Sequence, residues 1–344
     1  MKSTVGKLFL FLILVINATN MDVNDSVVKK LYVLAKSHID FIGDTAPTIY
    51  PATSVDMQLI KVSDHVYYAQ GEAGTATDNE GFISNAGVIV TDQGVVLFDT
   101  LGTPSLGHLL LQKIREITDK PIIKVIISHY HTDHFYGLQV FKDMGAEVIA
   151  TKGGEQYLQS DAVKNLFEER KKSLKPWVNQ FTRLIAPDTT INGQSDFTVG
   201  GVTFQLTPVG KNHAPGDLVM RVLPDNVLFV GDLVFEQRLP FVVGSDSKKW
   251  LETLDNLDIS HINVIVPGHG AASTHPKKTL RATREYLNYV RRTMQKAVEN
   301  IIPFDEAYNV DWSKYQYLPA FEKANRINAY SVYLSLEAES MDNN

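Results

Sequence analysis

The chain is built around Ile122-Ile-Lys-Val-Ile-Ile-Ser-His129-Tyr-His131-Thr-Asp133-His134, where a strand-like run meets a cluster of histidines and an aspartate. The run from 122 to 127 is mostly apolar and β-branched, which is typical of a central strand covered on both faces. Polar residues from Ser128 onward mark its carboxyl end, where open α/β sheets place their sites. We therefore expect the histidines and the aspartate to share a loop at that strand end.

The spacing of these four side chains indicates two adjacent metals. His129 and His131 alternate, so in an extended segment they point the same way, whereas Asp133 and His134 turn into the next helix and project differently. Neutral imidazole and carboxylate are the ligands of zinc and similar cations. The alternative is a histidine-rich polar loop without metal, but the chain has only ten histidines and a chance H-x-H-x-D-H match is rare.

Composition limits the class of protein, its partners and the residues that can bind a metal. The 344 residues are 44% hydrophobic, which is ample for a globular core. A net charge of −6 without a Lys/Arg block argues against nucleic acid as a partner. The chain has no cysteine, so any metal must be held by His, Asp or Glu.

The N-terminus predicts export. A basic start to Lys7, an apolar run from 8 to 16 and a small polar segment to Asn20 are typical of a secretory signal peptide over residues 1–20. The apolar run is short for a bilayer span, so no stable membrane span is expected after its removal. The alternative is an uncleaved anchor or a buried helix. We predict a periplasmic or secreted protein with a variable lead-in over 21–54.

The rest of the chain reads as two halves, each with strands followed by helices. Predicted strands cover 57–62, 65–70, 82–90, 94–99, 122–127, 147–151, 197–199, 202–207, 218–223, 227–230 and 263–266, and predicted helices cover 104–118, 135–144, 154–175, 248–257 and 276–298. This order indicates the α/β class and a four-layer αββα sandwich over residues 55–298.

Residues 299–344 are predicted to form a C-terminal helical cap. A helical stripe of apolar side chains supports it, made up of Phe321, Ala324, Ile327, Tyr330 and Leu334. Such a stripe indicates packing or a partner contact, so the C-terminal helices are also where we expect any oligomer contact.

Three more polar signals follow strands in the second half. His213 lies in a Gly/Pro loop, Asp232 follows Gly231 and is expected to close a strand at the sheet edge, and His269 lies between two glycines. Each alone is typical of turn chemistry. Singly, none of the three is a strong prediction of a site.

The six-residue motif and the order of the later signals resemble the metallo-β-lactamase-fold hydrolase superfamily over roughly residues 55 to 275. The segment 231–241 is similar to secreted bacterial members, the quinoprotein- and sulfur-oxidation-associated zinc hydrolases. The resemblance implies the metallo-β-lactamase fold and two Zn²⁺ ions, with manganese or iron as alternatives.

The resemblance also assigns residues. It implies that His129, His131 and His213 bind a first metal, that Asp133, His134 and His269 bind a second, and that Asp232 bridges them. Asp99 matches the family's strand-end aspartate and is expected to support the ligand loop without binding metal. Arg238 and the residues to Phe241 are expected to line the pocket or to form an ordinary salt bridge, and Asp217 stands where relatives carry varied polar residues. The other histidines match no motif and are interpreted as surface or structural residues, namely His38, His65, His108, His261 and His275.

Such a pair of metals predicts hydrolysis. A hydroxide held between them would cleave an ester, thioester, lactone, phosphodiester or amide bond of a small substrate, with Asp133 as the catalytic residue that orients it and accepts a proton. Alternatives are β-lactamase activity proper, a di-iron redox protein, and a non-catalytic metal-binding module. The flavodiiron relatives carry a carboxylate where this chain has His131, and a non-catalytic module would usually have lost ligands.

Overall fold

The computed structural model describes residues 50–342, which belong to one compact unit that begins at Tyr50. The predicted signal peptide, His38 and the lead-in up to residue 49 lie outside the described residues. In the part of the chain that is described, no helix has the length and apolar character needed to cross a membrane.

The first sheet has seven strands in sequential order, antiparallel from β1 to β4 and parallel from β4 to β7. Its strands are β1 (Leu59–Lys61), β2 (Val66–Ala69), β3 (Ala86–Val90), β4 (Val95–Phe98), β5 (Ile122–Ile126), β6 (Glu147–Thr151) and β7 (Thr189–Ile191). The strand that carries the histidine motif, β5, lies between β4 and β6, as its apolar run predicts. The short edge strand β7 was not predicted, because its few residues are mostly exposed threonines.

The second sheet has five strands in the order β12-β11-β10-β9-β8, all antiparallel except the parallel pair β11 and β12. Its strands are β8 (Ser195–Val199), β9 (Val202–Gly210), β10 (Asp217–Leu223), β11 (Val227–Phe235) and β12 (Val264–His269).

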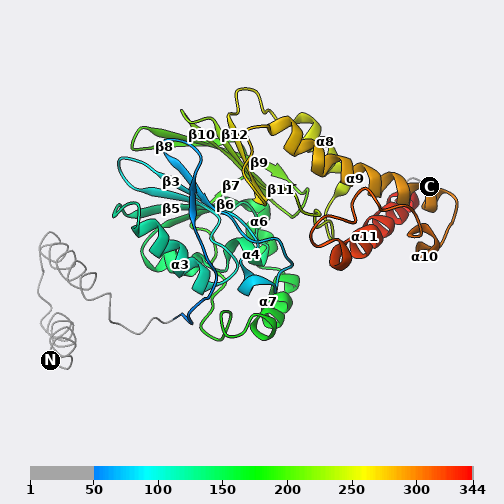
Figure 1. Cartoon of the computed structure of the whole chain (residues 1–344), viewed down its shortest axis with the longest axis horizontal. Coiled ribbons are helices and arrows are strands. Elements are labelled where there is room, and N and C mark those ends of the chain that lie inside the picture. Colours follow the sequence, from blue (N-terminus) through cyan, green and yellow to red (C-terminus); the bar gives the residue numbers. More distant parts are fainter. Residues whose placement is uncertain (1–49, 343–344) are drawn as a thin grey trace, which may run out of the picture. The chain divides into compact units, whose positions relative to one another are not determined.

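Three apolar clusters separate four layers. One lies between the outer face of the first sheet and its helices, a second lies between the two sheets, and a third lies between the outer face of the second sheet and its helices. Figure 1 shows α3 (Pro104–Arg115) beside the first sheet and α8 (Ser247–Asn256) beside the second. The predicted αββα sandwich is therefore confirmed.

Two predicted helices are each broken in two. Residues 135–144 contribute to α4 (Thr132–Phe135) and α5 (Leu138–Asp143), which are separated near Gly137. A Cβ at Gly137 would lie 2.0 Å from the carbonyl oxygen of Thr100, so only glycine allows this close approach. The second prediction, 154–175, becomes α6 (Lys152–Leu158) and α7 (Asp161–Ser173), because Ser160 caps a new helix by accepting from the Val163 N–H.

Two strands run further than predicted, and this moves a site residue. β11 continues to Phe235, with a register shift at Gly231, and it lies between β10 and β12. Asp232 is therefore an interior residue of an inner strand with only 4% of its surface exposed, and the expectation that it closes a strand at the sheet edge is wrong. β12 likewise continues to His269, which is its last residue.

The C-terminal part forms helices, as expected, but the buried face of the last one is different. α9 (Pro276–Glu299), the short α10 (Phe304–Ala307) and α11 (Phe321–Asp342) follow β12, and α9 packs against α11. In the predicted stripe Ile327, Tyr330 and Leu334 are exposed. The helix instead buries a neighbouring face that includes two asparagines, and this face consists of Ala324, Asn325, Asn328, Ala329, Val332, Tyr333 and Leu336.

Candidate metal centre

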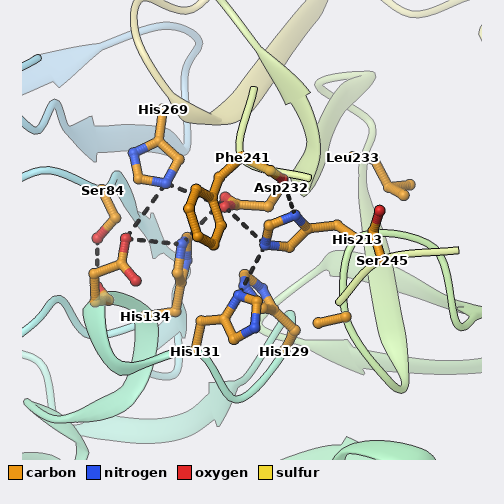
Figure 2. Close-up of polar contacts among 12 residues, drawn as sticks. Ser84, His129, His131, His134, His213, Asp232, Leu233, Phe241, Ser245 and His269 are labelled. Carbon is orange, nitrogen blue, oxygen red and sulfur yellow. Dashed lines mark hydrogen bonds and ion pairs between the residues drawn. The ribbon is translucent and has the colours of Figure 1, made fainter. Parts of the chain in front are cut away.

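Both sheets contribute to one cluster of imidazole and carboxylate groups. The first sheet supplies the loop after β5 and the first turn of α4, and the second supplies His213 from the β9–β10 connection, Asp232 from β11 and His269 from the end of β12. Figure 2 shows the rings of the labelled histidines turned towards one another around Asp232. All seven residues predicted as metal ligands come together, namely His129, His131, Asp133, His134, His213, Asp232 and His269.

The first predicted trio is compact. Ligand atoms of His129, His131 and His213 all lie within 4.8 Å of one another. The closest pair is His131 Nδ1 and His213 Nε2, at 2.8 Å. Two unprotonated nitrogens at this distance would repel each other unless a proton or a cation lies beside them, so this trio is arranged for a shared cation.

The second trio, Asp133, His134 and His269, meets the same distance limit. Asp133 Oδ2 lies 3.3 Å from His269 Nε2 and 3.6 Å from His134 Nε2. Asp232 lies between the trios, because its Oδ2 is 3.3 Å from His213 Nε2 and 3.1 Å from His269 Nε2. This single oxygen faces a residue of each trio, as a bridging ligand must.

The hydrogen bonds select which ring nitrogen each histidine presents. His213 Nδ1 donates to the Phe241 carbonyl oxygen at 3.0 Å, and His269 Nδ1 donates to the Ile83 carbonyl oxygen at 2.6 Å. A ring that donates from Nδ1 keeps the lone pair on Nε2, which is the atom that faces the cluster. Fixing a ligand imidazole through its other nitrogen is what metal sites in proteins do.

Asp99 fixes two more rings, that of His134 directly and that of His129 through Ser128. Its carboxylate accepts from His134 Nδ1 at 2.9 Å, from the Ser128 backbone N–H at 2.7 Å and from Ser128 Oγ at 2.6 Å. Ser128 Oγ in turn lies 2.9 Å from His129 Nδ1 and accepts its proton. Asp99 thus ties the ligand loop at Ser128 to the His134 ring. Ser128 was missed, since a serine at a strand end is an ordinary turn residue.

Several buried ligand atoms have no hydrogen-bond partner. They are His129 Nε2, which has no partner, and the pair His134 Nε2 and Asp232 Oδ1, which lie 3.1 Å apart. Because His134 donates its Nδ1 proton to Asp99, no hydrogen lies between the two atoms of this pair. Buried polar atoms without a hydrogen-bond donor are rare and costly, so these three atoms suit binding to a cation. Burial lowers the pKa of His213 to about 3 and holds that of His129 well below its ordinary value, which keeps both rings neutral as metal binding requires. The donor set of nitrogen and oxygen atoms therefore fits two divalent cations.

The loop that carries His213 is held by a buried carboxylate. Asp217 accepts from the backbone N–H groups of Asn212 and Ala214, at 3.1 Å and at 3.0 Å. Asn212 is held in addition through its Oδ1, which accepts from Thr253 Oγ1 in α8 at 2.7 Å. Asp217 therefore shapes the ligand loop and does not face the cluster.

The segment around His269 is held by the first sheet. Asn85 Nδ2 donates to the carbonyl oxygens of Pro267 and Gly270, both at 2.8 Å. A Cβ at Gly268 would lie 2.0 Å from Asp232 Oδ1, so glycine is required for the carboxylate to fit there. Arg238, which is 8% exposed, contacts His269 Nδ1 with its Nη1 and makes no salt bridge among the described residues.

The remaining described histidines lie away from the cluster, as predicted. His65 pairs with Asp225 at 2.8 Å, His108 packs against Tyr50, and His275 precedes the first residue of α9. His261 occupies a left-handed turn before β12.

Comparison with known proteins agrees with this architecture. A model of the metallo-beta-lactamase superfamily matches residues 79–269. A linear primary-alkylsulfatase from Pseudomonas sp. is 25% identical over 241 residues, 59% of this chain but only 45% of that protein. Metallo-beta-lactamase IND-1 from Chryseobacterium indologenes is 26% identical over 215 residues, 61% of this chain and 80% of that protein.

Solved structures show the same fold. The stereoselective inverting sec-alkylsulfatase Pisa1 from Pseudomonas sp. has a TM-score of 0.66 at 19% identity, over 81% of this chain and 50% of that one. A metallo-beta-lactamase from Pontibacter korlensis has a TM-score of 0.55 at 21% identity, over 68% of this chain and 99% of that one. The family match covers more than half of the chain and includes all seven clustered residues, so the chain belongs to the metallo-beta-lactamase superfamily.

Proposed function

We propose that the chain is a binuclear metal-dependent hydrolase that cleaves an ester-like or amide bond of a small substrate. The observation that carries the proposal is the convergence of seven buried or half-buried ligand groups, three of which turn atoms with no hydrogen-bond donor into the cluster. His129, His131 and His213 would hold one ion, and Asp133, His134 and His269 the other. Asp232 Oδ2 would contact both.

The chemistry divides between the ions and the chain. Two zinc ions in this site would supply Lewis acidity, which acidifies water and polarises the bond to be cleaved. We propose that Asp133 would orient water and accept its proton, and its accessibility supports this, since 14% of its side chain is exposed against 4% for Asp232.

The substrate class is tested by a panel. The relatives named above include a sulfatase and β-lactamases, so alkyl sulfates and β-lactams belong beside thioesters, lactones and phosphodiesters. We expect close to two metal ions per chain, most readily zinc, and hydrolysis of at least one ester-type substrate. Activity should disappear with a chelator and return with zinc. β-Lactam turnover alone would favour the alternative, a lactamase.

A proton-transfer variant separates binding from catalysis. Asp133→Asn keeps the shape of the side chain but cannot accept a proton, so hydrolysis should fall by about 10²–10⁴-fold. Metal content by elemental analysis should fall much less, because His134 and His269 remain. A protein that takes up no metal from zinc-replete medium would contradict the proposal.

We also propose that the protein is exported to the periplasm or secreted after removal of residues 1–20. The basic, apolar and small polar segments at the start of the sequence support this. Mass spectrometry of the natively produced protein should find a mature chain that begins near residue 21. A chain that retains Met1 would contradict it.

A further inference from the structure

We propose that Asn328, in the C-terminal helix α11, is a positioning residue for the first metal site and acts on His213 through the loop 240–242. The inference rests on the proposed metal centre and assigns a role to the C-terminal helices. Asn328 lies well beyond residue 269, where the family match ends. It has no contact of its own with the cluster, so its effect must be transmitted.

Asn328 acts on His213 through the backbone of residues 240–242. Asn328 Nδ2 donates to the Pro240 carbonyl oxygen at 2.7 Å, and Asn328 Oδ1 accepts from the Val242 backbone N–H at 2.9 Å. The residue between these two is Phe241, and its carbonyl oxygen accepts from His213 Nδ1 at 3.0 Å. Asn328 thus holds both sides of the carbonyl group that orients the His213 ring, which Figure 2 shows beside Phe241.

The loop needs such support because it has little of its own. Residues 236–246 contain no helix or strand, and Gly244 adopts a positive φ. At its two ends the loop is tied to the site, because Glu236 N–H donates to the His269 carbonyl oxygen at 3.0 Å and Asp246 N–H donates to the Asn212 carbonyl oxygen at 2.8 Å. Between these ends its further ties come from the C-terminal part, since Leu239 N–H donates to the Pro319 carbonyl oxygen at 3.1 Å and Gly244 N–H donates to Ser331 Oγ at 3.3 Å.

An asparagine suits this position chemically. Its side-chain amide carries a donor and an acceptor on one rigid plane, so one residue can satisfy a carbonyl and an N–H two residues apart. Asn328 is fully buried, and its Nδ2 also lies 3.0 Å from Tyr286 Oη, which fixes the amide plane. Replacing it with alanine would leave both loop groups unpaired in a buried place.

The effect should be confined to one metal. The imidazoles of the second trio are held by Asp99 and by the Ile83 carbonyl oxygen, and neither belongs to the C-terminal helices. Arg238 of the same loop also contacts His269 Nδ1, but the bond from Leu239 N–H to the Pro319 carbonyl oxygen holds that end of the loop without Asn328. A purely structural role for Asn328 would instead lower the melting temperature and disturb both metals alike. The two roles therefore differ in which metal-binding step changes.

The experiment is a zinc titration of the metal-free mature protein in competition with a chromophoric chelator. His213→Ala identifies which of the two steps belongs to the first site. Asn328→Ala should weaken that step by about tenfold, the lower end for residues that orient a ligand, and leave the other step within about twofold. Asn325→Ala is the matched control, because Asn325 is equally buried in the same helix and its side-chain hydrogen bonds go to Tyr286 and Tyr308 and not to the loop. Since Tyr286 also bonds Asn328, this control accounts for any effect of disturbing that tyrosine.

A double variant tests the route. In a His213→Ala background, Asn328→Ala should have no further effect on zinc affinity, because the ring it positions is absent. The inference would be overturned if Asn328→Ala weakened zinc binding as much in the His213→Ala background as in the wild type. It would also be overturned if Asn328→Ala and Asn325→Ala lost equal zinc affinity. Either result would leave the proposed metal centre intact.

A wild-type protein that binds no zinc would instead refute the proposed function, and the inference with it. Should Asn328→Ala fail to fold, Asn328→Asp keeps the acceptor for Val242 and removes the donor to Pro240. It should weaken the same step, and unchanged affinity would refute the role.

Discussion

Replacing Asp99 with asparagine should switch one metal ligand to the wrong tautomer. The carboxylate accepts three hydrogen bonds, from His134 Nδ1, from Ser128 N–H and from Ser128 Oγ. An amide of the same shape has only one oxygen, so in either orientation an N–H group replaces an acceptor. The backbone should tolerate the change, because Asp99 has a φ of 62° and asparagine adopts that region readily.

The size of the loss in zinc affinity depends on which hydrogen-bond donor loses its acceptor when Asp99 becomes asparagine. If the amide nitrogen faces His134 Nδ1, it donates to that atom, and the ring proton moves to Nε2, which can then no longer bind a cation. If it faces Ser128 N–H instead, one buried donor is left unpaired, at about 1–3 kcal/mol. Zinc affinity at the second site should fall by about 10- to 100-fold, which is about 1.4–2.8 kcal/mol.

The assay combines competitive zinc titration with urea unfolding of the metal-free protein. Asp225→Asn is the control, because Asp225 also accepts from a histidine, His65, with only 2% of its side chain exposed and no link to the cluster. Asp225→Asn should change the free energy of unfolding and leave both zinc affinities unchanged. If Asp99→Asn keeps both zinc affinities within about twofold, the reasoning about the His134 tautomer is refuted.

Asp232→Ala should lose most metal-dependent hydrolysis and weaken both zinc-binding steps, because Asp232 Oδ2 faces both trios. The control His261→Ala should keep activity and metal content. The reverse pattern would show that the ligand assignment is wrong. Removing zinc should lower the melting temperature, since a ligand at 100 times its Kd stabilises the folded state by about 2.7 kcal/mol, and identical melting curves would contradict a site built across both sheets. The Thr75 backbone N–H and then Lys323 lower the pKa of Asp78 to about 2, so its stabilising effect is complete above the ordinary value of 3.8 and disappears as pH falls towards 2. Because 36% of that side chain is exposed, Asp78→Asn should cost below about 1 kcal/mol in urea unfolding at neutral pH and less near pH 3, and a cost that grows in acid would contradict this sign.

The sandwich and the position of the first four candidate ligands were predictable because they depend on local signals, whereas the grouping of the later three with them rested on the resemblance to a family. The apolar run before His129 indicates a buried strand, and a polar cluster directly after it must lie at the strand end. The strand positions of Asp232 and His269 were not predictable in the same way. Gly231 and Gly268 indicate turns, whereas the strands continue through them because β11 and β12 pair with each other beyond the register shift.

The supporting groups were harder to predict, for two physical reasons. The Ile83 and Phe241 carbonyl oxygens are backbone atoms, which any residue supplies, so no side-chain pattern marks them. The buried face of α11 contains Asn325 and Asn328, and a search for apolar periodicity assigns these residues to solvent. Their partners, two tyrosines and a distant loop, are defined only by the tertiary structure.

The division of the ligands between the two sheets also determines when a metal can enter. His131 and His213 are separated by 82 residues, and their ring nitrogens meet only after the sheets have packed together. A cation therefore meets a complete set of ligands only after the sheets have packed, and its tight capture should be a late step. Once bound, it must be released before the sheets separate, which slows unfolding more than it speeds folding. Metal loading would thus lengthen the lifetime of the folded chain in a compartment that contains proteases.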